Sequence, residues 1–114
     1  MASHLVVSHG ADFFGQDRHP LAAVTGLAGY ATGTLPAAER RELVELLEHA
    51  ADGHTIEPAT AAVLADQLLR VSRHGFLPAK ASRLARALAD AAARAAADEE
   101  AWTWTATTDT EIAA

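Results

Sequence analysis

Four side chains that can bind a divalent metal lie close together near the start of the chain: His9, Asp12, Asp17 and His19. Imidazole and carboxylate groups in combination suit zinc, manganese or iron. The group begins where a short apolar run ends, and loops at strand ends often carry functional groups on a rigid scaffold. The spacing matches no specific metal signature, so the alternative is that the aspartates stabilise turns and the histidines fill half-buried polar positions. The sequence thus offers a possible divalent-metal site, and no other cofactor is expected.

A second candidate site is a basic window between Asp66 and Asp90, where the sequence has no acidic residue. Lys80 and Arg83 fall near the start of a predicted helix, where backbone N–H groups and cations together favour an anion. The alternative is ordinary, because basic side chains complement the carboxyl end of a helix dipole and solvate an exposed face. The residues of this anion or partner patch are Arg70, Arg73, His74, Lys80, Arg83 and Arg86.

The window spans a helix, a glycine turn and a second helix, which also fits a DNA-binding helix-turn-helix. Three features count against that interpretation. The second helix is rich in alanine, Pro78 occupies its first turn, and the formal net charge of the protein is −6. We therefore favour the ordinary interpretation of this window, and we rank an acidic protein partner above nucleic acid.

Two similar five-residue stretches, 33–37 and 75–79, separate the elements that position these residues. Each has a glycine that favours a helix end in the left-handed conformation and a proline that favours a helix start. Each stretch thus predicts the corner of a helical hairpin. Apolar stripes at helical spacing then predict four helices, at about 21–32, 36–51, 58–74 and 78–99.

Three short segments are typical of strands. Residues 5–8 are apolar and rich in β-branched side chains, 54–57 precede a proline, and 102–107 alternate with period two so that Trp102 and Trp104 share a face. The predicted fold is α+β with the order β-α-α-β-α-α-β, two αα-hairpins packed on a small sheet. We expect one domain over residues 1–107 and a flexible tail over 108–114. The aromatic residues expected to seal the core are Phe13, Phe14, Tyr30, Phe76, Trp102 and Trp104.

Composition limits the classes of function. The 114 residues include 29 alanines and no cysteine, which predicts close helix packing and excludes disulfides and thiolate sites. The first residues lack the basic region of a secretory signal and no segment is long enough to span a membrane, so we expect a cytoplasmic protein. The sequence contains no phosphate-binding loop, dinucleotide fingerprint or nucleophile elbow.

The segments 8–15 and 17–20, together with Trp102-Thr103-Trp104, resemble a family of small uncharacterised actinobacterial proteins, a domain of unknown function. The resemblance implies a bacterial cytoplasmic origin and brings no activity with it.

These observations favour a small binding or regulatory protein that acts through protein–protein contacts as a homodimer. The first alternative is a metal-dependent hydrolase or metal-binding enzyme centred on residues 9–19. The second is an acidic inhibitor or immunity-type protein, whose predicted second helix would present a row of glutamates to a basic target: Glu39, Glu42, Glu45 and Glu48.

Overall fold

The computed structural model describes residues 3–9 and 17–108, and it confirms the α+β class. The four helices and three of the four strands follow the predicted order β-α-α-β-α-α-β, and the fourth strand is an additional one near the amino terminus. In chain order the elements are β1 (Ser3–His9), β2 (Asp17–Pro20), α1 (Leu21–Thr34), α2 (Ala37–Glu48), the short 3-10 helix η2 (Ala50–Asp52), β3 (His54–Ile56), α3 (Pro58–Ser72), α4 (Ala79–Ala97) and β4 (Trp102–Thr108).

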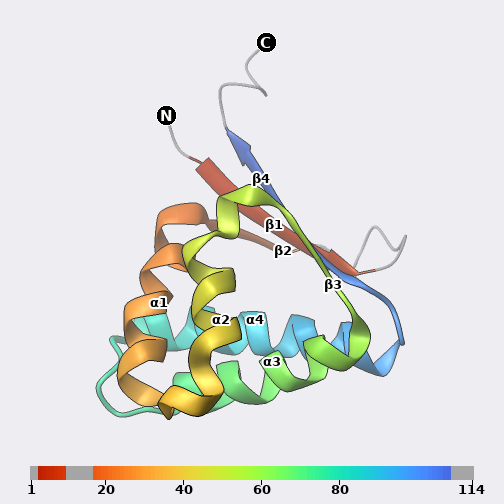
Figure 1. The fold of residues 1–114 in the computed structure, drawn as a ribbon. Coiled ribbons are helices and arrows are strands. Elements are labelled where there is room, and N and C mark those ends of the chain that lie inside the picture. The colour runs from red at the N-terminus through yellow and green to blue at the C-terminus, as the bar shows by residue number, and fades with distance from the viewer. Residues whose placement is uncertain (1–2, 10–16, 109–114) are drawn as a thin grey trace.

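The strands form one antiparallel sheet in the order β2-β1-β4-β3. All four helices lie on the same side of this sheet, with the α1–α2 hairpin standing beside the α3–α4 hairpin (Figure 1). Alternation along the central strands sends Leu5, Val7, Trp102 and Trp104 toward the helices, and all four are buried. The period-two pattern of the last strand therefore predicts its buried face correctly.

The additional strand, β2, is a segment that the sequence suggests to be part of a loop. It pairs with β1 so that Leu5 faces His19 and Val7 faces Asp17. Burial alternates along its four residues, but the two half-buried ones, Asp17 and His19, are polar, so the sequence shows no apolar alternation. Pairing with β1, which is a tertiary interaction, makes this segment extended.

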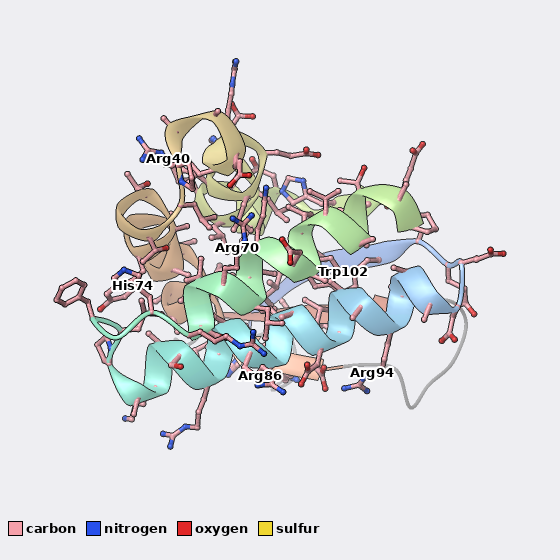
Figure 2. The ribbon with its side chains drawn as sticks, turned by 90° about the horizontal axis from the view of Figure 1, so that it is seen from below. Arg40, Arg70, His74, Arg86, Arg94 and Trp102 are labelled. Carbon is pink, nitrogen blue, oxygen red and sulfur yellow. The ribbon has the colours of Figure 1, made fainter. Side chains whose placement is uncertain are left out.

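Small side chains allow α3 and α4 to pack closely along their lengths, as the composition predicts (Figure 2). The buried face of α4 consists of Leu88 and a row of alanines: Ala85, Ala89, Ala91, Ala92 and Ala95. The bulk of the core comes from leucines on the other helices and from the two tryptophans, whose rings meet edge to face with centroids 5.2 Å apart.

Both predicted corners are present, but their glycines do not act as expected. Among the described residues only Gly53 is a glycine with positive φ, and Gly33 lies inside α1. The left-handed helix end predicted at positions 33 and 75 is therefore wrong. The prolines do mark the restarts, since Pro36 and Pro78 are the residues that immediately precede α2 and α4.

A side chain completes the first corner. Arg40 of α2 donates hydrogen bonds from Nη1 to the backbone carbonyl oxygens of Thr32, at 2.7 Å, and Leu35, at 3.3 Å. The last carbonyls of a helix have no partner within it, so a cation at this position satisfies them and also complements the helix dipole. Arg40 thus holds the end of α1 against the start of α2 (Figure 2).

The prediction that all the aromatic residues seal the core is wrong for two of them. Phe76 is 87% exposed at the α3–α4 corner, and Tyr30 on α1 is 36% exposed. Phe13 and Phe14 lie outside the described residues, as does most of the predicted tail, of which Thr108 ends β4. Within the described part of the chain, no helix has the length and apolar character needed to cross a membrane.

Candidate functional site

A groove of about 590 Å³ lies between α1 and α4 and opens to solvent. One face of α1 provides Ala23, Gly26 and Tyr30 to its wall. Most of the remaining wall comes from α4, on which Ala81, Leu84 and Ala87 supply apolar surface. The groove lies within the size range of ligand sites in proteins, which are mostly apolar with a few polar groups.

The polar groups of this groove include two cations that have no counter-ion in the described part of the chain. Lys80 and Arg83 both line it, and neither forms an ion pair with any residue that the structure describes. Among the described residues that line the groove, none carries a carboxylate. An apolar wall with uncompensated positive charge at its edge is suited to an anionic ligand that also carries apolar surface.

The position of Lys80 on α4 adds to this positive potential. Lys80 is the second residue of the helix, whose first turn contains no acidic residue and whose amino end has no side-chain cap. The helix dipole places partial positive charge at this end, so a cation there is unfavourable by about 0.3–1 kcal/mol unless an anion compensates it. This end of α4 therefore has an unmet preference for negative charge.

The third polar group is His19, which enters the groove from β2. Its Nε2 atom is buried and has no hydrogen-bond partner among the described residues. Burial lowers the pKa of His19, and the nearby Asp17 carboxylate opposes that shift only in part. The imidazole is therefore held toward its neutral form, with a ring nitrogen in need of a partner.

The structure divides the predicted basic patch. Arg70 binds Glu39 at 2.9 Å and Asp66 at 3.2 Å, so it joins α3 to α2, and Arg86 binds Asp90 at 3.3 Å. Hydrogen bonding to Glu39 is the main cause that raises the pKa of Arg70. Figure 2 shows Arg70 and Arg86 on different sides of the α3–α4 pair.

The remaining members of the patch are Arg73 and His74. Arg73 faces a second hollow beside Arg83 and Arg86, and the His74 ring packs on Phe76 with centroids 5.0 Å apart. The structure thus brings Lys80 and Arg83 to the groove and gives Arg70 and Arg86 counter-ions of their own.

The predicted metal ligands are only partly placed. Asp17 and His19 lie two residues apart on β2, whereas Asp12 and the side chain of His9 are outside the described residues. The residues that the structure does describe contain no cluster of three or more ligands able to hold a metal. A site that uses all four predicted ligands stays a prediction.

The predicted glutamate face of α2 is exposed along its length. Two of its four carboxylates already have partners, because Glu39 binds Arg70 and Glu45 binds Arg41 at 3.4 Å. Glu42 and Glu45 also border a hollow of about 360 Å³ that contains His49 and His54. In this hollow His54 Nε2 is already engaged with the carbonyl oxygen of His49 at 2.7 Å.

Comparison with known proteins adds one finding. Residues 10–105 match a family described as a domain of unknown function, DUF7739. The chain belongs to this family. No curated protein and no solved structure matches it. The resemblance recognised in the sequence is thus confirmed at the level of an uncharacterised family, and the match includes every residue that lines the groove.

Proposed function

We propose that this member of the family is a small binding or regulatory protein that recognises another protein through the side of the molecule where α1 meets α4. The observation that carries the proposal is the apolar groove edged by Lys80 and Arg83, two cations with no counter-ion among the described residues. Phe76, exposed at the neighbouring corner, adds an aromatic side chain of the kind enriched at interface centres.

A photo-crosslinking experiment tests this proposal. p-Benzoylphenylalanine replaces Phe76 in one variant and Val63, which is 53% exposed on α3, in another. Both variants are irradiated in a lysate of the cells that naturally produce the protein. We expect a discrete adduct from position 76 and none from position 63. Equal labelling from both positions, or none from either, would contradict the proposal.

We also propose that any homodimer uses this helical side in preference to a sheet edge. The two edge strands, β2 and β3, have only four and three residues, and β2 ends in Pro20. Short edges that contain proline are poor templates for pairing with another strand. An adduct of twice the chain mass from position 76, together with a dimeric mass by light scattering, is the expected sign of such a dimer. A dimer that does not crosslink from position 76 would contradict it.

The metal-enzyme alternative has its own test, because two of its predicted ligands can be removed together. Elemental analysis of the tag-free protein beside a His9→Ala/His19→Ala variant measures bound zinc, manganese and iron directly. Stoichiometric metal that is lost from the variant would favour the enzyme over the binding protein. Metal content that does not differ between the two proteins would remove this alternative.

A further inference from the structure

The groove has a hollow above Gly26 that a large side chain of a partner would fill. A Cβ atom built on Gly26 meets no heavy atom within 4 Å, so the space above this residue is open. The side chains around it are small or aliphatic, chiefly Ala23, Leu84 and Ala87. A bulky apolar side chain placed there would contact this apolar wall and lose part of its exposure to water, and apolar burial is a main source of energy at interface anchors.

The positive charges of the groove indicate which groups of the partner lie beside its large apolar side chain. Lys80 and Arg83 are one helical turn apart on α4, so they lie on the same side of the helix. Carboxylates of a partner would therefore meet two cations and the positive end of a helix dipole together. At the β2 end of the groove, His19 contributes to the wall.

The identity of the anion follows from the shape of the groove and from the net charge. The groove is open to solvent, so a free small molecule would leave much of its own surface exposed, whereas a peptide continues beyond the groove. A nucleic acid would bring many phosphates to a protein of net charge −6, and the groove offers only the cations Lys80 and Arg83 among its described residues. An acidic peptide avoids most of this repulsion because it is short and its charge is local.

From these features we infer that the α1–α4 groove binds an acidic peptide segment of the partner, with one large apolar side chain over Gly26 and carboxylates on Lys80 and Arg83. The inference rests on the proposed function and names the chemistry of the partner.

Titration of the ¹⁵N-labelled full chain with a synthetic peptide tests the inference. The probe is the acetylated, amidated peptide of sequence SDEEFLDEES. We expect shifts of backbone amides on the groove sides of α1 and α4 and a Kd below about 1 mM. Replacement of both the Phe and the Leu of the probe by Ala should weaken binding at least tenfold, and lysines in place of its acidic residues should abolish it.

Two pairs of variants distinguish an effect of the groove on binding from an effect of net charge or of stability. Lys80→Glu/Arg83→Glu should weaken binding at least tenfold, whereas Arg41→Glu/Arg94→Glu carries the same net charge and should bind within twofold of the wild type, because neither residue lines the groove. Gly26→Leu should fill the hollow and weaken binding at least tenfold, whereas Gly29→Leu should not, since Gly29 is also unobstructed but does not line the groove.

Several results would overturn the inference. It is wrong if the peptide causes no shifts at the groove, or if either groove variant binds as well as its matched control. It is also wrong if decanoate or a ten-nucleotide DNA shifts the groove amides and the peptide does not. A separate result tests the proposed function. If a protein crosslinks at position 76 but the peptide does not bind, the proposed protein partner is supported and the acidic peptide segment is rejected.

Discussion

Ser82 donates a hydrogen bond from its Oγ to the backbone carbonyl oxygen of Ser72, at 2.5 Å. Ser72 is the last residue of α3, and its carbonyl is among those that have no partner within the helix. Ser82 lies in the first turns of α4, between Lys80 and Arg83. This bond therefore fixes the amino end of α4, with both groove cations, against the carboxyl end of α3.

Replacement of Ser82 by Ala removes this bond and leaves the Ser72 carbonyl without its partner. We expect the free energy of unfolding to fall by about 1 kcal/mol, the usual magnitude for one partly buried hydrogen bond. Urea denaturation followed by circular dichroism measures the change. Ser82→Thr keeps the hydroxyl and serves as the control, and the account is contradicted if Ala and Thr have the same effect.

Reversal of the charge at Lys80 should stabilise the isolated protein. Glu in the first turn of α4 would complement the helix dipole that Lys opposes, and the α4 amino end has no other acid or side-chain cap. We expect Lys80→Glu to raise the free energy of unfolding by about 0.3–1 kcal/mol at low salt. Arg94→Glu, in the last turn and remote from the His74 corner (Figure 2), should lower it by a similar amount. A loss of stability in Lys80→Glu would show that the lysine has a structural partner.

Gly26→Ala should also stabilise the fold, because the site is exposed, helical and free of steric obstruction. Alanine in place of glycine within a helix contributes about 0.5–1 kcal/mol. Gly29→Ala meets the same conditions and should give the same increase in melting temperature, measured by thermal denaturation. A destabilised Gly26→Ala beside a stabilised Gly29→Ala would mean that the groove closes over Gly26 in solution.

The buried imidazole of His19 gives stability a pH dependence of known sign. Because its pKa in the folded state lies below 6.5, the unfolded chain binds the proton more readily. The contribution of His19 to the free energy of unfolding is therefore complete above pH 6.5. It declines as the pH falls through 6.5 toward the pKa of the folded state. The Asp17 carboxylate opposes this trend, because it favours the charged imidazole.

Urea titrations at pH 7.5 and pH 5.5 measure this contribution. The wild type should lose more stability over this interval than His19→Asn, which keeps a polar side chain but cannot titrate. Equal losses in the two proteins would show that the imidazole is solvated well enough to keep its ordinary pKa.

The sequence predicts the elements of this fold better than it predicts the site. Apolar periodicity and the prolines at 36, 58 and 78 locate the four helices, and alternation at 102–107 locates β4. These signals are local. The sequence does not predict β2, because the extended form of this segment depends on pairing with β1. Hydrophobicity alone predicts a buried Phe76, because it cannot show that a helical corner projects into solvent.

The groove is the least local feature of all, because it is formed by helices that are more than forty residues apart in the chain. Two signals do point to it. Lys80 falls in the first turn of a helix that has no acid there, and Ala23 and Gly26 place small residues three apart on one face of α1. The charge pattern alone cannot separate Lys80 and Arg83 from Arg70 and Arg86, whose counter-ions lie outside the basic window or at its edges.

The central claim is that Lys80 and Arg83 make the α1–α4 side a protein-binding surface. The most direct measurement is the yield of the adduct from p-benzoylphenylalanine at position 76, compared between the Lys80→Glu/Arg83→Glu and Arg41→Glu/Arg94→Glu backgrounds. These backgrounds have equal net charge and differ in whether the groove is altered. We predict that the adduct persists in the second background and falls at least tenfold in the first. Equal yields in the two backgrounds would contradict the claim.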